Sequence, residues 1–194
     1  MNRKIEVKRK TKETAIELKI NLEGKGKAKI FTTIPFLDHM LELFAFHSGI
    51  DLYLKAKGDT CIDDHHLVED IGIVLGTGFL KALKNKKGIT RYAHVMTPMD
   101  ESLSYVAIDI SGRPYLDYEV KFLPQYNKAG FDYSLIKEFM VAFVNNARIT
   151  LHIKLLKGEN NHHICESIFK SLGRVIKEAI KVRTKKIPSS KGVI

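Results

Sequence analysis

Two short stretches of this sequence combine adjacent histidines with a nearby glutamate. They read Asp64-His65-His66-Leu67-Val68-Glu69 and Asn161-His162-His163-Ile164-Cys165-Glu166, and each histidine and glutamate of the first recurs 97 residues later in the second. On a helix, which advances about 100° per residue, the glutamate lies about 40° from the first histidine and between the two rings. Imidazole and carboxylate groups are ligands for transition metals. Each stretch therefore predicts one metal-binding helix face.

The two histidines of a pair diverge by about 100° on a helix and can hardly chelate one ion. We therefore expect His65 and His66 to serve two different metals, with His162 and His163 doing the same. The spacing differs from that of HExxH zinc proteases, whose histidines lie four residues apart. A histidine on a helix is most often a packing or capping residue, but two such pairs with matching glutamates favour metal binding. His39 and His152 are candidates to complete the coordination, and ligand softness leaves zinc, manganese, iron and nickel open.

Alternating and helical patterns predict the elements that position these residues in the first half. A strand-like stretch at 3–20 followed by a Gly-rich turn predicts a hairpin with a strand at 27–31. Later expected elements are a helix at 36–47 behind Pro35, a strand at 50–56, and a helix to residue 83 capped by Asp63 or Asp64.

The second half repeats this order. We expect a strand at 102–110 paired with one at 115–122, a loop at 124–130, a helix from Asp132 to 145, a strand at 149–155, and a final helix to 182. Repeats of about 1–90 and 91–194 predict a single α+β domain, in which each repeat is a β-sheet covered on one face by two helices. We expect the repeats to form a pseudo-symmetric pair with their helices in contact.

Composition narrows the class of protein. The 194 residues are 44% hydrophobic, no apolar run approaches the roughly 20 residues of a membrane span, and the first residues lack the apolar segment of a secretory signal. Two cysteines are too few for a disulfide framework, so we expect the protein to lie in the reducing cytoplasm. The net charge of +10 suits anionic partners such as phosphorylated metabolites, although solvated lysine faces would give the same balance. Motifs of common nucleic-acid-binding folds are missing.

Several longer motifs identify a family that the sequence resembles. Phe36-Leu37-Asp38-His39-Met40-Leu41 and Gly58-Asp59 precede the first paired-histidine motif, and more segments follow in order: Arg91-Tyr92, Pro98-Met99-Asp100-Glu101, Ser111-Gly112-Arg113-Pro114, Leu151-His152-Ile153, Gly158-Glu159-Asn160-Asn161 and Ser189-Ser190-Lys191-Gly192. Together they resemble the imidazoleglycerol-phosphate dehydratases of histidine biosynthesis over nearly the whole chain. Ser167, where the family usually has Ala, and the approach Thr32-Thr33-Ile34-Pro35 depart from the pattern without touching a proposed ligand.

The resemblance implies that water is lost from D-erythro-imidazole glycerol phosphate to give imidazole acetol phosphate. It also implies two Mn²⁺ ions per active site, with eight ligands: His39, His65, His66, Glu69, His152, His162, His163 and Glu166. The departing carbon proton is barely acidic, so the imidazole ring must store the electrons. A metal on one ring nitrogen favours loss of the other ring proton, and the imidazolate can then expel the hydroxyl.

The proton-transfer and substrate-binding residues come from the same resemblance. Candidates for proton transfer are Glu13, Glu69, Glu166 and, more weakly, Asp100. Expected substrate contacts are Glu13, His39, His47, His65, Glu69 and His162, and those expected for the phosphate are Arg91, Arg113, Lys170, Ser189, Ser190 and Lys191. Arginine suits bidentate phosphate contact and lysine suits point-charge contact.

The resemblance further implies a homo-oligomer of 24 subunits built from trimers, with active sites shared at subunit interfaces. Two other functions remain open from the residues alone. One is a binuclear metallohydrolase of a phosphate ester, which would use the same ligands and basic surroundings. The other is a non-enzymatic protein that binds nucleic acid or buffers metal, for which no aromatic and basic interleaving is present.

Overall fold

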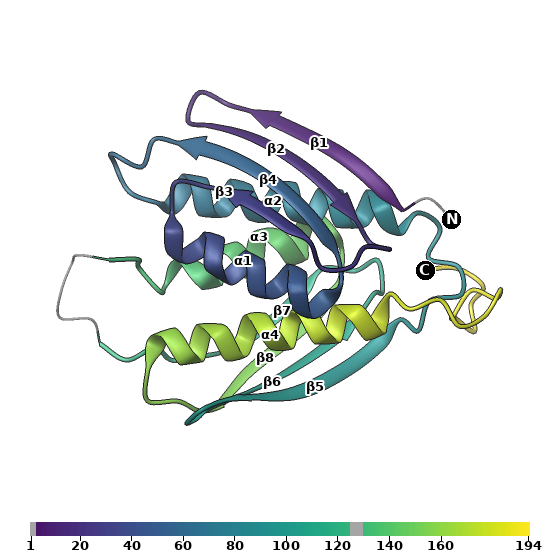
Figure 1. Cartoon of the computed structure of the whole chain (residues 1–194). Helices are drawn as coiled ribbons and strands as arrows, with labels where there is room; N and C mark the ends of the chain where they lie inside the picture. The colour runs from purple at the N-terminus through teal and green to yellow at the C-terminus, as the bar shows by residue number, and fades with distance from the viewer. Residues whose placement is uncertain (1–2, 125–129) are drawn as a thin grey trace.

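The computed structural model describes residues 3–124 and 130–194 and contains two repeats with the same order of elements (Figure 1). The first repeat comprises β1 (Lys4–Lys10), β2 (Thr14–Asn21), β3 (Ala28–Phe31), α1 (Pro35–Ser48), β4 (Asp51–Gly58) and α2 (His65–Leu83). The second comprises β5 (Tyr92–Met99), β6 (Ser102–Asp109), β7 (Tyr115–Glu119), α3 (Leu135–Ala147), β8 (Thr150–Lys157) and α4 (Asn161–Ala179). Their sheets have equivalent strand orders, β1-β2-β4-β3 and β5-β6-β8-β7.

The four helices lie between the two sheets, with α1 and α2 against the first sheet and α3 and α4 against the second (Figure 1). Buried and more exposed side chains alternate along the strands, so each sheet turns one apolar face toward the helices. In β2 this face carries the buried Ile16, Leu18 and Ile20. The predicted α+β class, with two helices packed on each sheet, is confirmed.

Local signals set the helix boundaries near the histidines. Pro35 occupies the first turn of α1, and Gly49 ends it in the left-handed conformation, with φ of 72°. The Asn160 side chain accepts hydrogen bonds from the backbone N–H groups of His162 and His163, which fixes the first turn of α4. Asp63 accepts one from the backbone N–H of His65 at the start of α2.

Two predicted strand pairings are wrong. Residues 3–20 form two strands, and β1 and β2 are the hairpin; β3 pairs instead with β4, in parallel. Likewise, β7 pairs in parallel with β8 and not with β6. The reason is the same in both repeats. A helix follows each of these short strands and returns the chain in the same direction, which makes a parallel crossover unit.

Two smaller boundaries also differ from expectation. α4 ends at Ala179 and not at 182, because Val182 forms an isolated antiparallel bridge with Ile89. The predicted loop at 124–130 falls largely on residues 125–129, which lie outside the described residues.

The helices pack across the repeats, α1 on α4 and α2 on α3. Glycines allow the close approach: a Cβ on Gly76 of α2 would lie 2.5 Å from the Phe143 carbonyl oxygen of α3. A Cβ on Gly173 of α4 would lie 2.9 Å from the Phe44 carbonyl oxygen of α1. The expected contact between the helices of the two repeats is therefore present.

Replacing Gly76 with alanine should force α2 away from α3, because the new methyl would meet backbone that cannot rotate aside. We expect Gly76→Ala to lower the free energy of unfolding by about 1–3 kcal/mol, as overpacking typically does. Denaturant titration measures this, and the exposed Lys81→Ala on the same helix should change it by less than about 0.5 kcal/mol. Equal stability of the two variants would contradict the close crossing.

Candidate active site

Both histidine pairs lie at the N-terminal ends of their helices, and their rings diverge. The rings of His65 and His66 have centroids 6.2 Å apart and planes at 84°; for His162 and His163 the values are 6.3 Å and 85°. The two copies thus share one geometry, as expected for adjacent positions on a helix.

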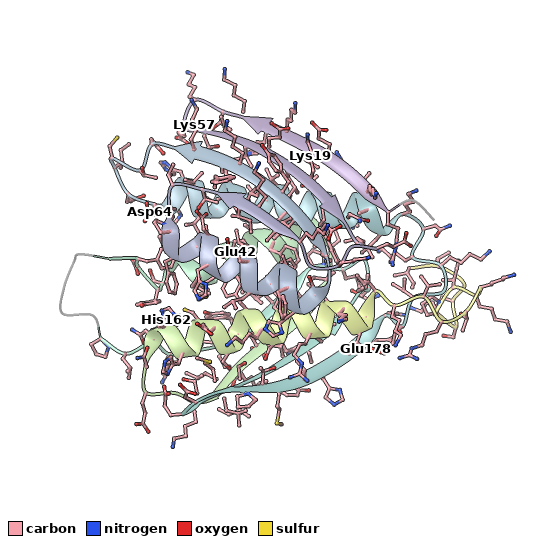
Figure 2. All side chains as sticks on the ribbon, in the orientation of Figure 1. Lys19, Glu42, Lys57, Asp64, His162 and Glu178 are labelled. Carbon is pink, nitrogen blue, oxygen red and sulfur yellow. The ribbon has the colours of Figure 1, made fainter. Side chains whose placement is uncertain are left out.

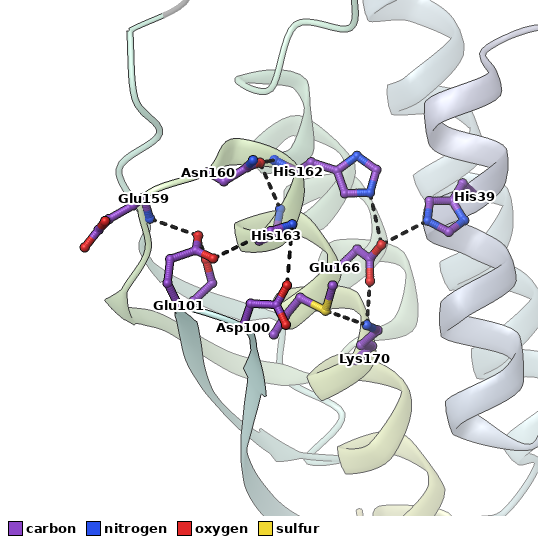
Figure 3. Close-up of polar contacts among 11 residues, drawn as sticks. His39, Asp100, Glu101, Glu159, Asn160, His162, His163, Glu166 and Lys170 are labelled. Carbon is purple, nitrogen blue, oxygen red and sulfur yellow. Dashed lines mark hydrogen bonds and ion pairs between the residues drawn. The ribbon is translucent and has the colours of Figure 1, made fainter.

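One compact group joins the two repeats. His39 Nε2 of α1 and His162 Nε2 of α4 lie 3.2 and 3.0 Å from the same oxygen of Glu166, Oε1 (Figure 3). Ligand atoms of these three residues all lie within 4.8 Å of one another. Both histidine side chains are over 40% exposed, whereas Glu166 is buried, so the group is open on its histidine side.

Glu166 remains ionised in this group. Its burial would raise the pKa, but hydrogen bonds from Lys170, His39 and His162 outweigh burial and lower the pKa to about 2. The strongest partner is Lys170, whose Nζ lies 2.5 Å from Glu166 Oε2 (Figure 3). A permanently charged carboxylate with two imidazoles is a donor set for a divalent transition metal.

Three further candidate ligands share a different arrangement, with a carboxylate held at Nδ1. The pairs are His66 with Asp59 at 3.1 Å, His152 with Asp117 at 3.1 Å, and His163 with Glu101 at 2.7 Å. The hydrogen bond to His163 lowers the pKa of Glu101 to about 2, and the carboxylates raise the pKa values of His66 and His163. Carboxylates in this position commonly orient histidines that bind a metal through Nε2.

The structure does not bring all eight predicted ligands together in one chain. His65 Nε2 and Glu69 Oε2 of α2 lie 3.9 Å apart on the surface, outside the compact group. His152 lies between the buried Leu151 and Ile153 on β8, so its side chain points to the outer face of the sheet, away from the helices. Within residues 3–124 and 130–194, only His39, His162 and Glu166 form a metal-type cluster.

The remaining proton-transfer candidates lie in the turns that join the first strands of each sheet. Glu13 is exposed between β1 and β2, and its charge contributes to the raised pKa of His66. Asp100 lies in the equivalent turn between β5 and β6, with its carboxylate 3.9 Å from His163 Nε2. Both turns therefore present a carboxylate beside the second histidine of a pair.

Most of the predicted phosphate contacts meet at another place. Arg91, Arg113, Ser189, Ser190 and Lys191 line a cavity of about 460 Å³ together with Ser111. Arg91 is fixed there by Asp109, 2.7 Å from its Nε, and by the Pro188 carbonyl oxygen, 2.8 Å from its Nη1. Lys170 and His47 do not line this cavity: Lys170 binds Glu166, and His47 lies at the end of α1 against Gly173.

The cavity around Arg91 and the metal-type cluster lie at opposite ends of α4. The backbone N–H of Arg91 binds the Ala179 carbonyl at the C-terminal end, whereas His162 lies in the first turn (Figures 1 and 2). At about 1.5 Å per residue these ends are roughly 25 Å apart. A single small substrate cannot span both sites of one chain.

Sequence reasoning assigned no role to the carboxylates that orient His66, His152 and His163. Asp59 and Glu101 stand within the family motifs, so a signal for them was present. Asp117 had none, because it meets His152 only through the parallel register of β7 and β8.

The two-repeat fold and its paired-histidine helices define an α+β protein with a candidate metal site. Comparison with known proteins then identifies the family. Residues 32–176 match the family model described as imidazoleglycerol-phosphate dehydratase. The chain is 54% identical to that enzyme from Caldicellulosiruptor saccharolyticus over all of both chains, and 54% identical to that from Clostridioides difficile over 97% of each.

Solved structures agree with the sequence relatives. The Staphylococcus aureus enzyme is 41% identical, with a TM-score of 0.83 over 93% of this chain and 99% of that one. The Pyrococcus furiosus enzyme is 40% identical, with a TM-score of 0.83 over 97% and 100%. The chain belongs to the imidazoleglycerol-phosphate dehydratase family, whose members are lyases of histidine biosynthesis. In the described part of the chain, no helix is long and apolar enough to cross a membrane.

The ionised Glu166 should make the metal-free protein sensitive to acid. Because its folded pKa of about 2 lies below the ordinary 4.5, its stabilising effect is present above pH 4.5 and is lost as the pH falls toward 2. The stability difference between wild type and Glu166→Gln should therefore shrink by about 1 kcal/mol from pH 6 to pH 3.5.

Denaturant titrations at the two pH values measure this difference. Glu159→Gln, an exposed residue just before α4, should leave the difference from wild type nearly constant. A difference for Glu166→Gln that does not change with pH would show that the carboxylate is not held in its charged form.

Proposed function

We propose that this chain is a manganese-dependent hydro-lyase that converts D-erythro-imidazole glycerol phosphate to imidazole acetol phosphate. The observation that carries the proposal is the group of His39, His162 and Glu166, in which two imidazoles from different repeats converge on one ionised carboxylate. Family membership supports this reaction, and the donor atoms of the group support a metal ion at this position.

The residues fit two Mn²⁺ ions per active site. One set of donors is the compact group, and the others are the exposed pair His65 and Glu69 and the three histidines whose Nδ1 atoms are held by carboxylates. Mixed imidazole and carboxylate donors suit manganese as well as zinc or iron. The bound ions would act as Lewis acids that hold the substrate imidazole and favour its deprotonated form.

The carboxylates of the chain divide into two kinds. Glu166, with a pKa of about 2, is too weak a base to accept a proton near neutral pH and serves better as a ligand. Glu13 is exposed beside His66, and its side chain makes no hydrogen bond or ion pair among the described residues. We assign proton transfer to Glu13, with Asp100 and Glu69 as further candidates.

The phosphoryl group of the substrate fits the cavity formed by Arg91, Arg113, Ser189, Ser190 and Lys191. Arginine and lysine donors with serine hydroxyls provide the contacts that a phosphate needs. Lys170 of α4 and His47 of α1 would contact the substrate outside this cavity.

We further propose that each active site is shared between subunits of a homo-oligomer, such as the 24-subunit shell built from trimers. Two features support this. The phosphate cavity and the metal-type cluster lie roughly 25 Å apart along α4, and His152 points away from the helices on the outer face of its sheet. A second and third copy can bring these parts together. The proposed location is the cytoplasm, in keeping with free Cys61 and Cys165.

Removal of metal tests the proposed chemistry. Exhaustive chelation should abolish formation of the ketone product, and added Mn²⁺ should restore it, because the ring cannot be activated without a Lewis acid. Product analysis by mass spectrometry and a phosphate assay separates the alternatives. Release of inorganic phosphate without a ketone product would instead indicate a binuclear phosphatase, and full activity after chelation would refute metal dependence.

Shared active sites predict complementation between inactive subunits. His39→Ala and His152→Ala chains should each be inactive alone, but refolding or co-expressing them together should restore up to about one quarter of wild-type activity, the share of sites assembled from intact parts in a random mixture. The matched control mixes His39→Ala with His162→Ala, which damage the same group and should not complement. Failure of both mixtures would place each active site within one chain.

A further inference from the structure

Lys86 is a largely buried lysine whose side chain has no paired anion in the described part of the chain. It lies in the connection between α2 and β5 and is only 7% exposed, although its neighbours Lys84 and Lys87 are exposed. Its backbone is left-handed, with φ of 55°, which is uncommon for a residue other than glycine. The chain thus adopts an unfavourable local conformation at a position where it also buries a charge.

The ammonium of Lys86 lies against the turn that forms one wall of the phosphate cavity. Its Nζ is 3.4 Å from the position that a Cβ of Gly112 would occupy, and the carbon of the Ile194 terminal carboxyl group is 3.5 Å from that same position. Gly112 lies between Ser111 and Arg113, which both line the cavity. Gly112 has no side chain that could screen the ammonium.

The charges near Lys86 are mainly positive. Burial lowers the pKa of Lys86 first, and the charges of Arg148 and Arg91 lower it further, while Asp109 acts in the opposite direction. Asp109 is already bound by Arg91 through two nitrogens, at 2.7 and 3.3 Å. In the described part of the chain, the Lys86 side chain makes no hydrogen bond or ion pair.

Burying most of a lysine side chain without a paired anion destabilises a protein, and an apolar side chain of similar length would be more favourable. The arrangement has a physical reason if an anion joins it. The cavity beside Gly112 already gathers the cations Arg91, Arg113 and Lys191. With Lys86 they outnumber the two anions nearby, Asp109 and the terminal carboxylate of Ile194.

We propose that Lys86 is an additional cation of the phosphate cavity, which strengthens binding of the phosphoryl group of the substrate from behind the Ser111–Arg113 turn. The proposal rests on the proposed function, because it takes this cavity to be the phosphate site. It concerns binding and not the chemical step, since Lys86 lies at the end of the molecule away from the metal-type cluster.

The test uses inorganic phosphate with the intact assembled protein. Isothermal titration calorimetry should show about tenfold weaker phosphate binding for Lys86→Met, since a positive charge close behind the cavity wall is lost. Lys86→Arg should retain most of the affinity. Lys87→Met, which removes an exposed lysine next in the chain, should bind as wild type does.

Two further readouts separate this role from a structural one. In phosphate-free buffer, Lys86→Met should unfold at the same or a higher temperature than wild type, because an unpaired buried charge has been removed. In steady-state kinetics it should raise KM for the substrate about tenfold and leave kcat within about twofold. A lower unfolding temperature with unchanged phosphate affinity and KM would make Lys86 a structural residue and overturn the proposal.

The outcomes also distinguish the two proposals. If the wild-type protein forms the ketone product and Lys86→Met has the same KM as wild type, only the proposed role of Lys86 is overturned. A wild-type protein that neither binds phosphate nor forms the ketone overturns the proposed function and, with it, the inference that depends on it.

Discussion

The close crossing of α1 and α4 is the constraint on which the metal-type cluster depends. Gly173 allows the two backbones to approach, since a Cβ there would meet the Phe44 carbonyl oxygen at 2.9 Å. At this separation His39 of the first repeat lies 3.2 Å from Glu166 of the second. The cluster is therefore a product of packing between repeats, and α2 and α3 provide the matching contact on the other side of the helix layer.

Carboxylates play two different parts around the histidines. Glu166 faces the Nε2 atoms of His39 and His162 and, with Lys170 beside it, keeps its charge in a buried setting. Asp59, Asp117 and Glu101 instead bind Nδ1 atoms from behind and leave the opposite ring nitrogen available. The first arrangement supplies a ligand, whereas the second fixes the orientation of a ring.

Charge is also arranged unevenly along α4. Its N-terminal end carries carboxylates and imidazoles suited to cations, and beyond its C-terminal end the cavity around Arg91 gathers groups suited to a phosphate. The two ends are roughly 25 Å apart, so one chain carries two separate groups of side chains, one suited to cations and one suited to an anion. An assembly that brings the ends of different chains together would join them, which relates the proposed catalysis directly to the proposed oligomer.

The repeat, the helical faces of His65–Glu69 and His162–Glu166, and the family could all be predicted from the sequence, because they depend on spacing within one segment and on long local motifs. The strands that pair with β3 and β7 could not be predicted from the sequence, since the parallel pairing arises only when α1 and α3 fold back on their sheets. Asp117 likewise meets His152 only through that register. Nothing in the sequence marks Lys86 for burial beside Gly112, because its burial depends on contacts between segments that are far apart in the chain.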